Sequence, residues 1–214
     1  MDLKFRYVNI KILLTITSIS FSSTVSAQDD GFFKLSTPVK LWILTHPFSA
    51  CKAKKIAEIA RIRAVELKND SRLDGLENGG QIDAFRHAYW MALMAQKYTC
   101  GKAFRLGRAY EKGNVRDFKK GNREEGELPD SVSVAMDSYN NCIGVFIGFE
   151  NPEASEGELA DVVIKKILEG EMMIVKRNRN GFFLSCDGQI IGNNEWRGKW
   201  NNQRCLVNSN FKTF

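Results

Sequence analysis

Hydrophobic residues recur at helical spacing along most of the chain. They predict a helix from Ser49 to about Lys68, a second from Gln81 to about Tyr98, and a third from about Lys102 to Lys112. A fourth helix is expected to begin at Pro129-Asp130 and run to about Phe146, and a fifth spans about Glu156 to Leu168.

Polar segments that contain glycine separate these helices. Residues 69–80 and 113–128 are rich in charged residues and glycine, so both predict exposed loops. Near the C-terminus, short β-prone runs at 172–175 and 182–186 flank the turn-forming residues 178–181, which predicts a hairpin. The sequence therefore predicts a mainly α fold, a helical bundle of about five helices with a small C-terminal β-hairpin appendage.

The first 27 residues have the features of a signal peptide. Three basic residues precede an apolar, hydroxyl-rich stretch, and small residues follow at 25–27. We divide the chain into a signal peptide (1–27), an α-helical domain that carries the polar site (28–170) and a small β-rich segment (171–214). The protein is then expected to be exported, either to the periplasm or out of the cell. The alternative is an uncleaved N-terminal anchor.

Composition narrows the class of protein. The 214 residues include 31 Lys and Arg and 25 Asp and Glu, and 11% are aromatic, which excludes a disordered chain. No apolar run long enough to span a membrane follows the first thirty residues, which excludes a multi-pass membrane protein. Three positive residues and one acid belong to the signal peptide, so the net charge falls from +6 to +4 without it. Acids interleave with the remaining positive residues, and we expect no nucleic-acid partner.

The five cysteines all follow the predicted signal peptide. In an oxidising compartment they predict disulfides, with one thiol left over. Cys186 and Cys205 bracket the C-terminal segment and are the first choice for one bridge. Two of Cys51, Cys100 and Cys142 could form a second, unless these are small buried residues without a partner. No CxxC pair is present, so a zinc ribbon is not indicated.

The segment from residue 83 to residue 90 carries the clearest chemical signal. On a helix, Asp83 and His87 share a face, so the carboxylate can orient the imidazole and raise its basicity. Arg86 is a candidate phosphate ligand, and Trp90 is a candidate substrate-binding residue. The alternative is that Asp83 caps the helix and His87 is a satisfied core residue.

A second polar stripe lies on the predicted fourth helix. Asp137, Asn140, Asn141 and Gly144 fall at helical spacing on an otherwise apolar helix, and two asparagines in mid-helix need a reason. An early helix end or an interhelical hydrogen bond would also explain them. The candidate catalytic cluster comprises Asp83, Arg86, His87, Glu111, Asp137, Asn140 and Asn141.

Three segments, at residues 78–90, 106–111 and 136–144, together resemble a bacterial domain family of uncharacterised function. That family occurs in secreted proteins and at the ends of polymorphic toxins, and it is similar to the Wnt-like (lipocone) grouping. The resemblance covers residues 47–148. Tyr110 stands where the family often has His, so we expect no role for a second histidine.

The resemblance implies a hydrolase or head-group transferase that acts on a phosphoester of a lipid or lipid-linked envelope molecule, with peripheral membrane contact compatible with that role. His87 would be the general base or nucleophile, and Glu111 and Asp137 could take up protons or bind a divalent cation. The sequence leaves metal binding open, with Ca²⁺ or Mg²⁺ favoured over Zn²⁺. The alternative is a non-enzymatic envelope binding protein whose polar cluster is a structural hydrogen-bond network.

Overall fold

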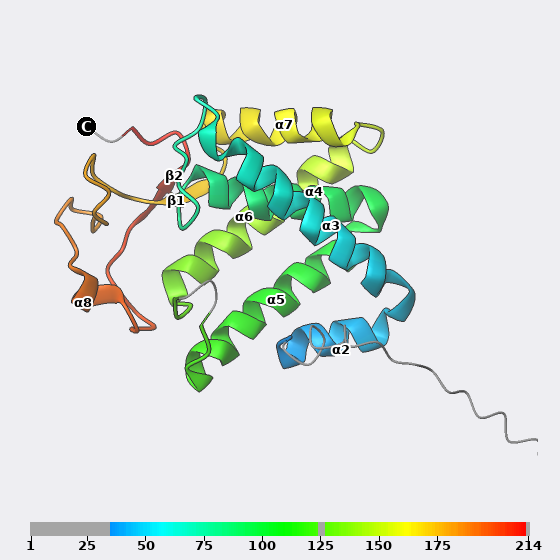
Figure 1. Ribbon diagram of the computed structural model, residues 1–214, viewed down its shortest axis with the longest axis horizontal. Coiled ribbons are helices and arrows are strands. Elements are labelled where there is room, and N and C mark those ends of the chain that lie inside the picture. The colour runs from blue at the N-terminus through cyan, green and yellow to red at the C-terminus, as the bar shows by residue number, and fades with distance from the viewer. Residues whose placement is uncertain (1–34, 124–126, 213–214) are drawn as a thin grey trace, which may run out of the picture. The chain divides into compact units, whose positions relative to one another are not determined.

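The structure, a computed structural model, describes residues 35–123 and 127–212. The predicted signal peptide lies outside these residues. The elements are α2 (Thr37–Thr45), α3 (Pro47–Glu66), a 3₁₀ turn (Leu67–Asn69), α4 (Gln81–Lys97), α5 (Cys100–Lys120), α6 (Ser131–Glu150), α7 (Glu156–Glu169), β1 (Met173–Val175), α8 (Asn193–Trp196) and β2 (Leu206–Asn208). The prediction of a mainly helical fold with a small sheet near the C-terminus is confirmed (Figure 1).

Helix α4 is the core element of the described chain. It packs against α3, α5, α6 and α7, which surround it in Figure 1. Its sequence is rich in Ala, Met and Leu and contains no Gly or Pro, which favours a helix, and residues 82–85 and 87–95 are all buried. The Tyr89 hydroxyl donates a hydrogen bond to the Glu156 carbonyl at 2.9 Å, so this polar tip is satisfied. A helix that is covered on nearly every side belongs in a core.

The contact between α4 and α6 is unusually close. A Cβ atom added to Gly144 would collide with the carbonyl oxygen of Ala88, and one added to Gly148 would collide with that of Ala92. Both alanines are completely buried. The two backbones therefore touch where glycine on one helix faces alanine on the other, and this contact fixes how the side chains around it meet.

The prediction of a loop at 113–128 is wrong for residues 113–120, which are helical. Helix α5 continues to Lys120 and ends at Gly121, which has a left-handed φ of 73°. Gly113 is buried inside the helix, where a Cβ would collide with the side chain of Ser36. The glycine at 113 therefore permits close packing, whereas the glycine at 121 ends the helix.

The C-terminal segment, which we define as residues 172–212, pairs its strands differently from the predicted hairpin. The expected turn forms, since Asn178 donates its backbone N–H to the Phe182 carbonyl at 3.0 Å and Gly181 has a φ of 81°. Its arms, however, meet only in an isolated bridge between Arg177 and Phe183. Strand β1 pairs antiparallel with β2 instead. The physical reason is burial: β1 has Ile174 and Val175 in the interior, whereas Phe182 is exposed.

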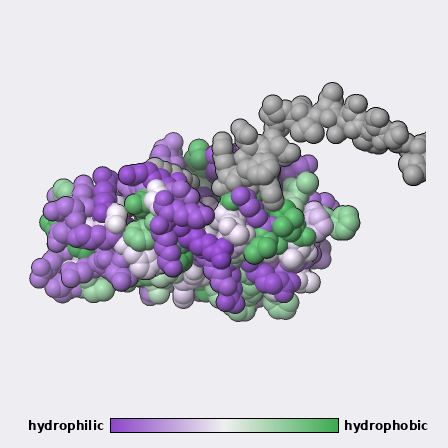
Figure 2. Space-filling view, turned by 90° about the horizontal axis from the view of Figure 1, so that it is seen from below, coloured by the Kyte–Doolittle hydropathy of each residue, from purple (hydrophilic) through white to green (hydrophobic). Residues whose placement is uncertain are grey.

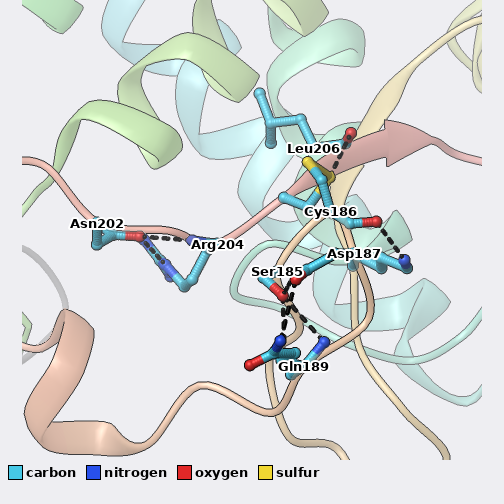
Figure 3. Close-up of a disulfide and its surroundings, with 9 residues drawn as sticks. Ser185, Cys186, Asp187, Gln189, Asn202, Arg204 and Leu206 are labelled. Carbon is cyan, nitrogen blue, oxygen red and sulfur yellow. Dashed lines mark hydrogen bonds between the residues drawn. A yellow bond between two sulfur atoms is a disulfide. The ribbon is translucent and has the colours of Figure 1, made fainter.

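One of the predicted disulfides forms. Cys186 is bonded to Cys205, and the Cys186 carbonyl accepts a hydrogen bond from Lys176 at 3.2 Å (Figure 3). The expected second bridge does not form, because Cys51, Cys100 and Cys142 are free thiols. They lie on α3, α5 and α6, and the packing of these helices fixes their positions. The disulfide closes the C-terminal segment on itself.

The surface carries scattered hydrophobic residues. The face seen in Figure 2 is mostly hydrophilic, with hydrophobic residues gathered in smaller groups. Leu41, Leu44 and Phe48, on α2 and at the start of α3, are among the exposed large hydrophobic residues. No helix in the described part of the chain is both long and apolar enough to cross a membrane. Peripheral membrane contact stays a prediction.

The contact between α4 and α6 can be tested with Gly144→Ala. The added methyl group has no space against the Ala88 carbonyl, and overpacking of this kind lowers the free energy of unfolding by about 1–3 kcal/mol. The matched control is Gly157→Ala on α7, where a Cβ meets nothing within 4 Å; that variant should gain about 0.4–1 kcal/mol. Urea denaturation measures both. Equal stability of the two variants would contradict the close packing.

The disulfide can be tested by replacing Cys186 and Cys205 with serine together. The bridge spans a sequence separation of 19 residues, and its loss from a loop of this size should cost about 3 kcal/mol of unfolding free energy. Thermal and urea denaturation measure the loss. Cys51→Ser is the control, because this thiol is free and exposed, and it should leave stability unchanged.

Candidate functional site: a buried histidine between two carboxylates

The loop before α4 is shaped by two aspartates. The Asp74 carboxylate accepts hydrogen bonds from the backbone N–H groups of Leu76 at 2.9 Å and Gln81 at 3.0 Å, which holds the loop against the start of α4. Asp83, in the first turn of α4, accepts the N–H of Gly79 at 2.8 Å through Oδ2. Asp83 therefore holds the loop residue before the N-cap Gly80 with one of its oxygens, but α4 has no side-chain cap, so the alternative interpretation of Asp83 as a cap is not met.

The other Asp83 oxygen faces a histidine. His87 lies one turn along α4, and its Nε2 is 3.5 Å from Asp83 Oδ1 and 3.4 Å from Asp137 Oδ1 on α6. The exposed fractions of the three residues are 7%, 2% and 8% in the order Asp83, His87 and Asp137. Their ligand atoms all lie within 4.8 Å of one another. We call these three residues the histidine centre.

A chain of hydrogen bonds holds the far side of the imidazole. His87 Nδ1 is 3.3 Å from Asn141 Oδ1, and Asn141 Nδ2 donates to Glu111 Oε1 at 3.1 Å. The other Glu111 oxygen accepts from Asn114 Nδ2 at 3.2 Å. Glu111 and Asn141 are both candidates from the sequence. Asn141 contacts the imidazole at Nδ1 and Glu111 contacts Asn141, whereas Asp83 lies at Nε2 on the other side of the ring.

Burial sets the charge of the imidazole. Loss of solvent, and then the positive charge of Arg86, lower the pKa of His87 well below its usual value, and the hydrogen bond to Asn141 opposes this only in part. His87 is therefore neutral at pH 7. The expectation that Asp83 raises the basicity of the imidazole is wrong, because burial dominates.

Arg86 points toward the same group of residues. Its Nη2 donates to Asp83 Oδ1 at 2.6 Å, and about a quarter of its side chain is exposed, at 26%. Guanidinium groups in partly exposed positions can bind a phosphate through two parallel hydrogen bonds. The geometry leaves Arg86 at the boundary between the histidine centre and solvent.

The histidine centre adjoins a pocket of about 80 Å³, which we call the central pocket. Its wall comes from four parts of the chain: the start of α4 with its loop, Asn114 on α5, the start of α6 with residues 127–130 before it, and the C-terminal segment. The lining residues include Asp83, Arg86, Asp130, Asp137, Phe183, Trp196 and Arg204. The C-terminal segment thus forms one side of the pocket.

A buried ion pair fixes this side of the pocket. Arg204 donates to Asp130, the residue that caps α6, and both side chains are almost fully buried. The Arg204 guanidinium also lies over the ring of Trp196, 4.4 Å from its centroid. Sequence reasoning missed this pair because its two residues are 74 positions apart, a separation at which no spacing rule applies.

A wider groove of about 550 Å³ continues from the central pocket, with Asn78, Glu127, Phe183 and Trp196 lining both. It adds Arg177, Phe182 and Arg197, so its lining combines positive and aromatic side chains. Burial and the nearby charge of Arg204 lower the pKa of Arg177. We call this the outer groove.

Two of the predicted site residues, Asn140 and Trp90, make their contacts away from the central pocket. Asn140 Nδ2 donates to the Met173 carbonyl at 2.9 Å and Asn140 Oδ1 accepts the Met173 N–H at 2.9 Å, so its amide holds β1 as another strand would. Trp90 packs edge-on against Tyr110, with ring centroids 5.5 Å apart. Neither residue lines the central pocket.

The fold and site define a mainly α-helical protein with a buried histidine–carboxylate centre. Residues 40–171 match the family described as a domain of unknown function, DUF6973, and the chain belongs to that family. No curated protein and no solved structure matches the chain. The matched range includes the whole histidine centre, whereas Phe183, Trp196 and Arg204 lie beyond it.

The structural role of Asn140 can be tested with Asn140→Ala. The change removes both partners of the Met173 backbone groups, and each buried group left without a hydrogen bond costs about 1–3 kcal/mol. Urea denaturation should show a clear loss of stability. Ser138→Ala, an exposed site on the same helix, is the control and should be neutral. If Asn140→Ala were as stable as this control, the structural role assigned to Asn140 would be contradicted.

Proposed function

We propose that this protein is an exported hydrolase or head-group transferase that cleaves a phosphoester of a lipid or lipid-linked envelope molecule. The observation that carries the proposal is the histidine centre, a buried neutral imidazole between two carboxylates at the wall of a pocket that also contains Arg86. Polar groups of this kind are costly to bury and are found together mainly at functional sites.

The residues supply the parts that such a reaction needs. In phosphoester cleavage, the hydroxyl of a water or an acceptor alcohol attacks phosphorus, and the bond between phosphorus and the leaving oxygen breaks. The attacking hydroxyl loses its proton and the leaving oxygen gains one. The carboxylates of Asp83 and Asp137 are within reach of the pocket to exchange these protons, and Arg86 can donate hydrogen bonds to the phosphoryl oxygens.

The substrate class and the compartment have separate support. The lipid or lipid-linked character of the substrate rests on the resemblance to the lipocone grouping. The outer groove, with Arg177, Arg197 and Phe182, offers positive and apolar contacts next to the central pocket that suit an anionic head group and its neighbouring atoms. The Cys186–Cys205 disulfide is typical of proteins in oxidising compartments, which supports export.

The alternative of a non-enzymatic binding protein also has support, from asparagine side chains that join elements of the fold. Asn140 and the Asn141–Glu111 pair use their amide groups for bonds that join elements of the fold. If the histidine centre belonged to the same structural network, its removal would cost stability and nothing else. The two functions therefore differ in what a substitution at the centre does.

The proposed function is tested with His87→Ala and Asp137→Asn. Turnover of phosphoester-labelled lipids and lipid-linked precursors by the purified protein should fall by at least about 100-fold in each, because Asp137 is assigned a proton transfer and His87 lies against both carboxylates that carry this role. Asp161→Asn is the control, since this carboxylate lies exposed on α7, and it should keep full activity. Equal turnover in all variants would sink the catalytic assignment.

Thermal melts of the same variants separate the two functions. Residues of an active site cost little stability when they are removed and can even stabilise the fold. A structural network predicts instead that His87→Ala lowers stability by about 1–3 kcal/mol. A large loss of stability with no turnover in the parent protein would favour the binding protein.

A further inference from the structure

The position of Asn141 determines which nitrogen of His87 carries the proton. Asn141 Nδ2 donates to the Glu111 carboxylate, so its Oδ1 must be the atom that faces His87 Nδ1. An amide oxygen only accepts hydrogen bonds, and Nδ1 must therefore carry the proton. With the amide turned round, Oδ1 would face the carboxylate, and two acceptors would oppose each other. In a neutral imidazole the proton on Nδ1 leaves Nε2 with an exposed lone pair.

That lone pair is directed at two other acceptors. His87 Nε2 faces Asp83 Oδ1 at 3.5 Å and Asp137 Oδ1 at 3.4 Å, and it has no hydrogen-bond donor among the residues that the structure describes. His87 is 2% exposed, so bulk water does not compensate for this. Three such acceptor atoms that converge in the interior form a site that a cation between them would satisfy.

The spacing of the three atoms suits a metal ion. Ligands bound tetrahedrally at about 2.0–2.1 Å lie about 3.4 Å from one another. The two distances from Nε2, 3.5 and 3.4 Å, are close to this value. Asp83 is further held by Gly79 N–H and Arg86, and His87 by Asn141, as the ligands of metal sites usually are by their surroundings.

We propose that Asp83, His87 and Asp137 bind one divalent transition-metal ion, with Zn²⁺ the first choice. An imidazole nitrogen in the ligand set favours Zn²⁺ over Ca²⁺ and Mg²⁺, which take oxygen ligands. The sequence-based preference for Ca²⁺ or Mg²⁺ rested on one histidine with acids being an unusual ligand set for zinc. Asp83 and Asp137 line the central pocket, so an ion held by them would be accessible from the pocket, as in catalytic zinc sites with three protein ligands.

The charge of the central pocket links this ion to the proposed function. Asp83, Glu127, Asp130 and Asp137 line it together with Arg86 and Arg204, which leaves a formal charge of −2. A phosphoester is itself anionic and is repelled from such a pocket, whereas one divalent ion brings the charge to zero. Metal binding stands on geometry alone, and only its link to phosphoester chemistry rests on the proposed function. There the ion would polarise the phosphoryl oxygen and activate a bound water.

The test uses the full chain after treatment with a chelator. Titration calorimetry with Zn²⁺, and metal analysis of the protein after gel filtration, should give one ion per chain. His87→Gln and Asp137→Asn should weaken binding by more than about 100-fold. Asn141→Ala should weaken it by about 10–100-fold, because Asn141 only positions the imidazole. Asp161→Asn, an exposed carboxylate on α7, is the control and should bind like the parent.

The free thiols need their own control, because cysteine also binds zinc. The titration is repeated with Cys51, Cys100 and Cys142 all changed to serine, and the Co²⁺-substituted protein should show the absorption of nitrogen and oxygen ligands without a thiolate band. Circular dichroism checks that each variant folds. The metal site would be overturned if the serine variant failed to bind Zn²⁺. It would also be overturned if His87→Gln and Asp137→Asn both bound the ion at the parent's affinity.

The outcome also separates the two proposals. Stoichiometric Zn²⁺ binding without turnover of any phosphoester would remove the proposed function and leave the metal site in place. Turnover that persists in the chelated protein would overturn the ion's role in that chemistry and leave the proposed function in place. The metal site itself is then overturned only if the Zn²⁺ titration shows no binding.

Discussion

The contact between the backbones of α4 and α6 is the constraint on which the site depends. Gly144 and Gly148 have no side chain, so α6 rests directly on the carbonyl groups of Ala88 and Ala92. Asn141 lies one turn before Gly144 and Asp137 two turns before it, on the same face. This close approach is what brings Asp137 Oδ1 to 3.4 Å from Nε2 of His87, which neighbours Ala88. A wider spacing between the helices would leave the imidazole with carboxylate contacts from its own helix alone.

The same segments that form the site also dock the C-terminal segment. Gly79, whose N–H binds Asp83, has a φ of 72°, and its carbonyl accepts the Val175 N–H at 2.7 Å. A Cβ at Gly79 would lie 2.9 Å from Val175 Cγ2, so glycine is required here for the strand to approach. Asn140 then holds Met173, two residues earlier on the same strand. Residues of the family range thus place a segment outside that range beside the pocket, and the pocket wall depends on both.

The sequence predicted the site better than it predicted the contacts between distant segments. The helical spacing of Asp83 and His87 gave their shared face correctly, since it depends only on the geometry of one helix. Asn140 and Asn141 show the limit: they are neighbours about 100° apart around α6, and one binds β1 while the other binds Glu111 and faces His87. Which asparagine faces which partner depends on how α6 packs. The contact between Arg204 and Asp130 likewise depends on how distant segments pack. So does the position of Gly113, which lies inside a helix against Ser36 and does not end the helix.

The cost of burial bears on what the histidine centre is for. Asp83, Glu111 and Asp137 are all buried close to a neutral imidazole, an arrangement that opposes folding unless each group is satisfied. Hydrogen bonds offset much of this cost. The Asp83 carboxylate accepts from the Gly79 N–H and from Arg86, and the Glu111 carboxylate accepts from two asparagine amides. A network that served packing alone would be expected to satisfy Nε2 of His87 as well, and a leucine or methionine in its place would fill the core without this cost. The hydrogen bonds around the imidazole instead fix its orientation and direct its lone pair toward the two carboxylates. The unsatisfied Nε2 costs local stability, and the binding of a cation next to the pocket is a physical gain that can offset this cost.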